Sequence, residues 1–410
     1  MKATFRSLEH RNFRLFFTGQ LISQVGNWLT LVAQTLLVFK LTHSGVALGF
    51  LAAAQFGPVL LLGAFAGLVA DRSDKRKLLL IVQSLAMVQS FALGAVAFMH
   101  HPPVAAIFAI AVFGGLATAF DNPARRSFVV EMVPDDDMTN AISLNSALMT
   151  GSRVIGPALA GALIATVGFG WAFVVDGLSY IAVIAGYMRM RPSELRRAEP
   201  AVRGRGQIRE GVRYVRSVPD LWIPLVMMTV VGTLAFNFQT VLPVFVARDL
   251  NGGTLTFTLL FSVVSIGSLA GALITARRTH VSRTNVSTAA LAFAATMVLL
   301  ALSPNTAVAF VVAVFLGVAS IAFMTASTAI VQTRALPSMR GRVLSLQAMV
   351  FLGSTPIGGP IVGTISQNLG ARYALGLGAL GCLGAGVFGL LNRADAVAEV
   401  PSESSPLLLP

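Results

Sequence analysis

Gly67-Leu-Val-Ala-Asp71-Arg72-Ser-Asp74-Lys75-Arg76-Lys77 is a short, strongly charged stretch in an otherwise apolar part of the chain. Apolar segments lie on both sides of it, at about 46–70 and 77–99. Each is at least as long as the roughly 20 residues that an α-helix needs to cross the hydrocarbon core of a bilayer. The stretch is therefore predicted to be a tight polar loop between two membrane-spanning helices.

The whole chain has the composition of a polytopic membrane protein. Of its 410 residues, 55% are apolar and only 11% are charged, whereas a soluble domain carries about 25% charged residues. The mean hydropathy of +0.77 is far too high for a surface covered by water. The apolar segments do not alternate polar and apolar positions as barrel strands do, so we expect α-helices. We expect twelve spans, at about 13–39, 46–70, 77–99, 103–122, 140–166, 170–188, 221–247, 254–276, 284–302, 306–332, 343–368 and 371–391.

The distribution of basic residues predicts the orientation. With twelve spans, both termini and the even-numbered loops share one side, and that side holds all but four of the 30 lysines and arginines. The exceptions are Lys40, Arg248 and Arg372 on the other side and Arg153 inside span five. By the positive-inside rule we expect a multi-pass protein of the plasma (inner) membrane with both termini in the cytoplasm. The net charge of +13 then reflects topology, so we expect no nucleic-acid partner.

The chain is predicted to contain two related halves of six spans each. Residues 141–163 align with residues 343–365 without a gap, and glycines recur at matching positions. Two such repeats are typical of transporters that work by alternating access. The predicted domains are an N-terminal six-helix bundle at 1–190, a cytoplasmic linker with an amphipathic helix at 191–219, a C-terminal six-helix bundle at 220–393 and a cytoplasmic tail at 394–410.

The charged loop resembles the signature of the major facilitator superfamily, which reads Gly, three residues, Asp, Arg/Lys, any residue, Gly and two basic residues. Asp74 stands where the family has its second glycine. The resemblance implies an all-α fold of twelve transmembrane helices in two pseudo-symmetric bundles. It also implies a conformational latch, because the aspartate of this motif engages the other half when the cytoplasmic side is shut. The matching latch residues here are Gly67, Asp71, Arg72 and Arg76.

Span five contains a second motif, Gly151-Ser-Arg-Val-Ile-Gly156-Pro157-Ala-Leu-Ala-Gly161. It is similar to the antiporter motif of drug exporters in the same superfamily, with Ala160 in place of the first of two closing glycines. Glycine and proline weaken the hydrogen-bond ladder of a span and let a neighbouring helix approach closely. We expect this motif to form a bendable, tightly packed contact between the halves.

Further stretches narrow the resemblance to the twelve-span drug:proton antiporters that include macrolide-efflux and enterobactin-exporter-like proteins. This implies export of a small lipophilic compound, a drug or a siderophore-like molecule, by alternating access and proton antiport. Two alternatives stay open: a transporter of lysophospholipids or other lipids with the same fold, and a membrane receptor that does not transport. The stretches are residues 19–28 in span one, 120–125 after span four, 173–179 in span six and 340–343 before span eleven.

Few charged residues lie inside the spans, and these are the candidates for proton coupling. Arg153 and Asp176 lie well inside spans five and six, and Asp121 lies near the cytoplasmic end of span four. A charge at mid-bilayer costs a few kcal/mol on insertion scales, so such residues face the bundle interior and often have a function. Counting from the loop at 167–169 places Arg153 about 9 Å deeper than Asp176. The pattern leaves open whether the two form a fixed ion pair or whether Asp176 titrates.

Polar side chains follow one face of span one, within about 100° of helical arc. A weaker polar stripe follows span seven, its repeat partner. Uncharged polar residues in a membrane helix line water or another helix, and we expect both stripes to line a central cavity. The residues are Gln20, Gln24, Asn27 and Gln34 in span one and Thr233 and Asn237 in span seven.

The sequence contains no metal-ligand spacing, nucleotide-binding loop or paired nucleophile and base. We therefore expect no enzyme activity, no cofactor, no metal site and no direct use of ATP. The expected partners are a small lipophilic substrate, protons and membrane lipids, and we expect a monomer. The single cysteine, Cys382, lies in an apolar run and excludes a disulfide within the chain.

The substitution Asp71→Asn is expected to abolish or strongly slow transport, because an amide lacks the charge that stabilises a facing helix N-terminus. Membrane insertion and substrate binding should stay largely intact. Turnover in proteoliposomes, measured beside insertion yield, checks this prediction. Normal turnover in a correctly inserted Asp71→Asn protein would remove the latch role.

Overall fold

The structure is a computed structural model that describes residues 3–196, 207–276 and 282–392, and every regular element in these ranges is a helix. Twelve helical segments there are long and apolar enough to cross a membrane, as predicted. The spans are α1 (Arg11–Thr42), α2 (Gly45–Arg72), α3 (Lys75–Ala97), α4 (Val104–Glu131), α5 (Asp135–Thr166), α6 (Phe169–Arg189), α8 (Pro219–Leu234) with α9 (Phe238–Arg248), α10 (Thr254–Ala276), α11 (Arg283–Ala301), α12 (Thr306–Arg334), α13 (Pro337–Asn368) and α14 (Ala371–Leu391). Short helices are η1 (Ala3–Glu9), η2 (Pro192–Glu194) and α7 (Gln207–Ser217).

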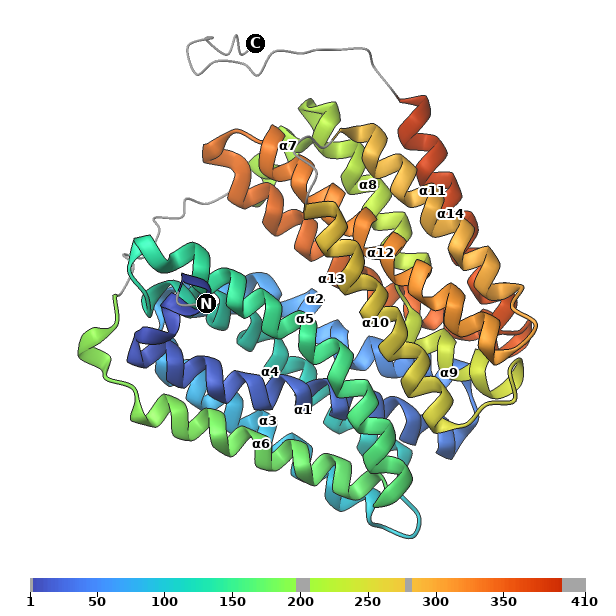
Figure 1. Ribbon diagram of the computed structural model, residues 1–410, viewed down its shortest axis with the longest axis horizontal. Coiled ribbons are helices and arrows are strands. Elements are labelled where there is room, and N and C mark those ends of the chain that lie inside the picture. The colour runs from blue at the N-terminus through green and yellow to red at the C-terminus, as the bar shows by residue number, and fades with distance from the viewer. Residues whose placement is uncertain (1–2, 197–206, 277–281, 393–410) are drawn as a thin grey trace.

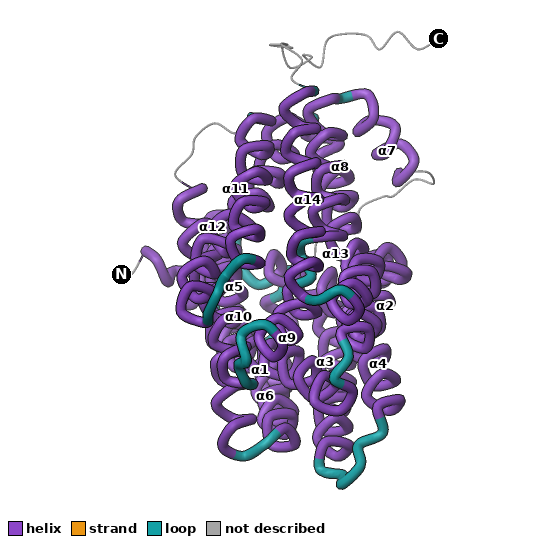
Figure 2. The backbone as a smooth tube through the Cα atoms, turned by 90° about the vertical axis from the view of Figure 1, so that its right-hand side faces the viewer, coloured by secondary structure: helices purple, strands orange, loops and turns teal. Residues whose placement is uncertain are grey.

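The spans form two bundles, α1 to α6 and α8 to α14 (Figure 1). The bundles meet mainly where α2 lies along α13 and α5 lies along α10. Short loops join most of the helices within each bundle (Figure 2). We call the end of the molecule with the loops at 73–74 and 132–134 the basic end, and the end with the loops at 43–44 and 167–168 the opposite end.

Helix α4 continues past its predicted end. We expected span four to stop near residue 122, but the helix runs to Glu131, and the stretch 120–125 lies inside it. A helix needs no lipid around it to continue, because its own backbone bonds carry on into the polar region. The extension buries Arg125 within the bundle, at 7% exposure. Arg125 is therefore a residue inside a transmembrane helix, contrary to our expectation of a loop.

Span seven is interrupted rather than continuous. We expected one helix at 221–247, but α8 ends at Leu234 and α9 begins at Phe238. The side-chain amide of Asn237 donates to the Thr233 carbonyl at 2.7 Å and so satisfies a backbone acceptor at the break. Irregular backbone is tolerated at membrane depth where it lines a cavity, and the break does so here.

The linker helix α7 packs on the C-terminal bundle. Val215 is buried in a cluster with Leu221 and Val343, and Glu210 pairs with Arg342 of α13 at 2.8 Å. The apolar face predicted for this helix therefore covers the basic end of α8 and α13.

Near the opposite end, α2 and α13 cross through glycines. Gly45 lies against Gly363, and Gly49 lies so close to Gly359 that a Cβ on Gly49 would overlap the Gly359 carbonyl. Small residues let transmembrane backbones approach closely and gain dispersion energy along the crossing. These two pairs therefore hold the bundles together at the opposite end.

Hydrogen bonds reinforce this closure. Arg248 of α9 donates to the carbonyl of His43 at 2.9 Å and to Oε1 of Gln367 at 3.0 Å. The same Gln367 oxygen accepts from the backbone N–H of Gly45 at 2.9 Å. Charged and polar side chains of one bundle thus satisfy helix-end groups of the other, which need partners of this kind.

At the basic end the same two helices have separated. Gly67 lies five turns of helix after Gly49 and therefore on the same face of α2, and Gly341 lies five turns before Gly359 and therefore on the same face of α13. A Cβ at either Gly67 or Gly341 would meet no atom within 4 Å. The space between the bundles therefore widens toward the basic end.

The substitution Gly49→Leu is expected to disfavour closure at the opposite end, because overpacking costs about 1–3 kcal/mol and about 1.4 kcal/mol is tenfold in an equilibrium. The fraction of molecules closed at that end, measured by distances between paired spin labels, should fall about tenfold. Gly57→Leu in the same helix is the control, because a Cβ there would meet no atom within 4 Å. Equal effects of the two substitutions would contradict the role of the crossing.

Candidate functional site

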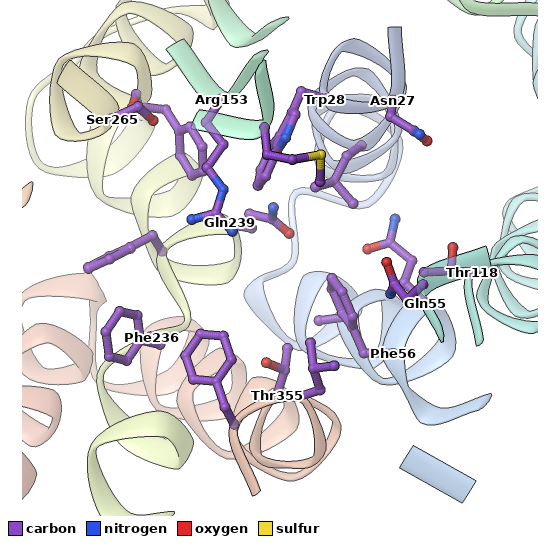
Figure 3. A pocket seen from close by; sticks show the side chains of 18 of the residues that line it. Asn27, Trp28, Gln55, Phe56, Thr118, Arg153, Phe236, Gln239, Ser265 and Thr355 are labelled. Carbon is purple, nitrogen blue, oxygen red and sulfur yellow. The ribbon is translucent and has the colours of Figure 1, made fainter. Parts of the chain in front are cut away.

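A cavity of about 420 Å³ lies between the two bundles. Its wall is formed by residues of both halves, from α1 to α5 on one side and from the break of span seven, α9, α10, α12 and α13 on the other (Figure 3). Pockets for small organic ligands have volumes of about 300–1,000 Å³. The cavity is thus large enough for a compound of drug size.

The two sides of the cavity differ in chemistry. Every charged residue of the lining belongs to the N-terminal half, which also contributes the amides Gln24, Gln34 and Gln55. The C-terminal half contributes an aromatic surface in which Phe236 packs against Phe351 at a ring distance of 5.3 Å. A ligand that fills the cavity therefore meets charge only on the N-terminal side and most of the aromatic surface on the C-terminal side.

Arg153 of α5 is exposed to the cavity although it lies deep in the bundle. Its guanidinium carbon lies 5.3 Å from the centre of the Trp28 ring. Among the residues that the structure describes, no carboxylate lies within 4.0 Å of its nitrogens. Arg153 is thus an unpaired cation on the cavity wall, held by a cation–π contact.

Asp176 of α6 is completely buried, in a cage of hydroxyl groups. Thr30 and Ser90 each donate to its Oδ2 at 2.6 Å, and Ser179 lies 3.4 Å from its Oδ1. The ion pair with Arg153 that the sequence left open is absent. Its absence agrees with the unequal depths of the two residues along neighbouring helices.

Asp176 lies directly behind the cavity wall. Thr30, which donates to its carboxylate, also lines the cavity. One turn before Thr30, on the same face of α1, a Cβ at Gly26 would overlap the Asp176 carboxylate, so the glycine creates the room for it. One threonine hydroxyl therefore separates this carboxylate from the cavity.

Asp121 and Arg125 form a buried ion pair one turn apart on α4, with Oδ2 of Asp121 at 3.1 Å from Nε of Arg125. Gln83 of α3 donates to the other oxygen of Asp121 at 2.7 Å. Arg125 also donates to Asn122 at 3.2 Å. The Asp121 carboxylate is thus neutralised and hydrogen-bonded where it stands.

The polar stripe of α1 divides between the cavity and the bundle interior. Gln24, Asn27 and Gln34 line the cavity, as does Asn237 at the break of span seven. Gln20 turns away and donates to the hydroxyl of Tyr187 at 3.0 Å. Thr233 is also outside the lining, with its hydroxyl bonded to the Thr229 carbonyl at 2.7 Å.

The charged stretch 67–77, which forms the end of α2, the loop 73–74 and the start of α3, holds the ends of helices together within the N-terminal bundle. Arg76 donates to the carbonyls of Tyr187 and Met188 at 2.6 and 3.1 Å. Asp74 accepts from the Lys77 N–H at 3.1 Å and so caps the start of α3, which explains an aspartate where the signature has glycine. Asp71 and Arg72 form the last turn of α2, and the latch role stays a prediction.

The motif of span five makes contacts both within and between the bundles. Gly156 lies against Trp28 of α1, and Gly161 lies against Thr258 of α10. Both contacts are so close that a Cβ on the glycine would overlap the neighbouring side chain. Pro157 between them is buried. Gly151 lies five residues before Gly156, and a Cβ on it would meet no atom within 4 Å. The close approach of α5 to the other half therefore rests on Gly161.

Several residues of the site were not singled out from the sequence, and three of them illustrate why. Arg125 was placed after span four because the apolar segment ends near residue 122, whereas an i,i+4 spacing from Asp121 would have indicated a pair on one helix. Gln83 is one of two glutamines in an apolar span, and an amide there is itself a signal for a buried polar contact. Gln239 lines the cavity beside the break of span seven, and no pattern in the sequence marked it.

The comparisons with known proteins agree with this architecture. The family described as "Transmembrane secretion effector" matches residues 2–408 of the chain. The staphyloferrin A transporter of Staphylococcus aureus is 23% identical over 64% of this chain and 66% of its own length, slightly less than two thirds. The multidrug efflux pump Tap of Mycobacterium tuberculosis is 25% identical over 87% of both chains. Macrolide efflux protein A of Streptococcus pyogenes is 21% identical over 89% of this chain and 93% of its own.

Solved structures with the same fold include a bacterial homologue of the human lysosomal transporter Spinster in an inward-facing, unoccupied conformation. It has a TM-score of 0.70 and 16% identity, over 93% of this chain and 95% of that chain. A POT family transporter bound to a thioalcohol-conjugated peptide has a TM-score of 0.77 and 10% identity, over 93% and 96%. At these identities the likeness shows the fold alone. The family match over residues 2–408 establishes that this chain belongs to the transmembrane secretion effectors of the major facilitator superfamily, a family of multi-pass transporters and not of enzymes.

Proposed function

We propose that the protein exports a small lipophilic compound, a drug or a siderophore-like molecule, by alternating access and in exchange for protons. The observation that carries this proposal is a cavity between the bundles with a buried carboxylate, Asp176, one hydroxyl group behind its wall. The names of the relatives, which include a multidrug efflux pump, a macrolide efflux protein and a siderophore transporter, support export.

The proposed orientation follows the positive-inside rule, with the basic end in the cytoplasm of a cell that carries the protein in its plasma (inner) membrane. The bundles are joined at the opposite end by the glycine crossing and by Arg248. In this orientation the structure is the inward-facing state, ready to receive substrate from the cytoplasm. The protein acts as a monomer in this proposal, since one chain supplies both walls of the cavity.

Asp176 suits proton exchange better than Asp121 does. Hydroxyl groups donate to a carboxylate and accept from a carboxylic acid after a rotation, so the cage of Thr30, Ser90 and Ser179 satisfies both protonation states. A guanidinium only donates, so the Arg125 contact of Asp121 offers no acceptor for the proton of a carboxylic acid. Thr30 reaches both the cavity and Asp176 and is the route by which a proton would enter.

Asp176→Asn tests the coupling. The neutral amide resembles the protonated acid, so we expect loss of pH-driven efflux of a lipophilic fluorescent dye from proteoliposomes, with downhill exchange retained. A pH gradient supplies about 1.4 kcal/mol per entering proton and pH unit, so the concentration ratio lost is about tenfold per pH unit.

Asp136→Asn is the matched control, because this carboxylate is exposed at the basic end. It should leave pH-driven efflux unchanged. Retained pH-driven efflux in a stable Asp176→Asn protein would defeat the proposal for this residue and direct attention to Asp121. Loss of both modes together with a lower melting temperature would assign Asp176 a structural role.

Cysteine labelling tests whether the cavity is the aqueous path. In a Cys382→Ser background, Asn27→Cys should react with a membrane-impermeant thiol reagent, and a transported dye should slow the reaction. Leu21→Cys, on the outer face of the same helix and 49% exposed there, should not react in a bilayer. Equal labelling of both positions would mean that α1 does not line an aqueous path.

A further inference from the structure

The charges on the cavity wall do not cancel. The charged residues of the lining are Asp121, Arg125 and Arg153. Arg125 neutralises Asp121, and Arg153 has no carboxylate within 4.0 Å among the described residues. Asp176 has no surface open to the cavity and is satisfied by hydroxyl groups. The cavity wall therefore carries one uncompensated positive charge.

This charge is held in a defined position. The guanidinium carbon lies 5.3 Å from the Trp28 ring centre, and the other ring neighbour of Trp28 is Phe261 of the opposite bundle, at 6.2 Å. A guanidinium over an aromatic ring keeps the N–H donors at its edge free for a planar acceptor. No hydrogen bond from Arg153 to another described residue uses these donors. The side chain is thus preorganised for a ligand.

The surroundings of Arg153 suit an amphiphilic ligand. Figure 3 shows Arg153 and Gln239 pointing into the same part of the cavity, with Phe236 on the aromatic wall beyond them. Thr150 lies about one turn before Arg153 on α5 and also lines the cavity. One polar region with an unpaired cation thus lies next to one aromatic region.

From this arrangement we infer that the transported compound is an organic anion, with a carboxylate or sulfonate group bound by Arg153 and an apolar body against the Phe236 and Phe351 wall. Arginine binds carboxylates through two parallel hydrogen bonds. A cationic compound would be repelled by Arg153 and would find no free carboxylate on the wall. The inference rests on the proposed function, because it takes the cavity as the substrate site, and it adds the charge of the substrate.

The first test measures the charge preference of the cavity itself. A cysteine at Gln239, in a Cys382→Ser background in zwitterionic-lipid nanodiscs, is reacted with an anionic and with a cationic methanethiosulfonate. The anionic reagent should react relatively faster, and Arg153→Gln should lower the anion-to-cation rate ratio at least about tenfold, as removal of a unit charge a few ångströms away predicts. Lys77→Gln, which removes an exposed charge outside the cavity, should leave the ratio unchanged. A ratio that is unaffected by Arg153→Gln overturns the inference.

The second test uses a matched pair of probes, dansylglycine and its uncharged amide. Dansylglycine should protect the cysteine at position 239 at concentrations about tenfold lower than the amide, because a bidentate arginine contact is worth about 1.5–3 kcal/mol. Arg153→Gln should abolish the difference, and Arg153→Lys should keep part of it. No protection by dansylglycine up to its solubility limit, or equal protection by both probes, overturns the inference.

These measurements need no pH gradient, so they separate the inference from the proposed function. An anion-selective cavity in a protein without pH-driven efflux would overturn proton antiport and keep the inference. Proton-driven efflux of cationic dyes through a cavity without anion preference would keep proton antiport and overturn the inference. Unchanged melting temperatures of the Arg153 variants show that a loss of selectivity is not a loss of fold.

Discussion

The packing of glycine against glycine between α2 and α13 is the contact on which the arrangement of the two bundles depends. In a bilayer no hydrophobic force drives helices together, so close backbone approach and polar contacts hold them. Gly45 and Gly49 provide that approach at the opposite end, where Arg248 adds hydrogen bonds between the bundles. Because the crossing is local, the bundles are free to diverge toward the basic end. The cavity exists in the space that this divergence leaves.

The two bundles contribute different chemistry to the cavity. The N-terminal bundle holds all the charges of the lining and the buried carboxylate Asp176, whereas the C-terminal bundle provides most of the aromatic surface. A substrate that contacts both walls therefore connects the proton site to the relative position of the bundles. Helix α1 is the physical link, because Thr30 contacts Asp176 while Trp28 contacts Arg153 and Phe261. The internal repeat in the sequence thus describes the backbone architecture and not the distribution of function.

The spans and their grouping follow from the sequence, because apolar length and the distribution of arginines depend only on local composition. The break at Asn237 does not, since no proline or glycine stands within the segment 234–238 and the side-chain bond to Thr233 appears only in three dimensions. The hydroxyl cage of Asp176 comes from α1 and α3 as well as α6, and its assembly depends on helix rotations that hydropathy does not report. The position of Gln20 could not be predicted for the same reason. The polar stripe of α1 is wide enough for Gln20, at its edge, to face Tyr187 of α6 rather than the cavity.

An anionic substrate changes the energetics of the proposed exchange. One proton entering against a neutral substrate moves one charge across the membrane, which supplies about 2.3 kcal/mol per 100 mV. The same proton exchanged for a departing monoanion moves two charges in the same sense, so the potential supplies about 4.6 kcal/mol per 100 mV. An inside-negative potential then favours export even of the anion alone. The unpaired Arg153 would in that case have a further use in the cycle, because it offsets the loss of hydration that an anion suffers within the membrane.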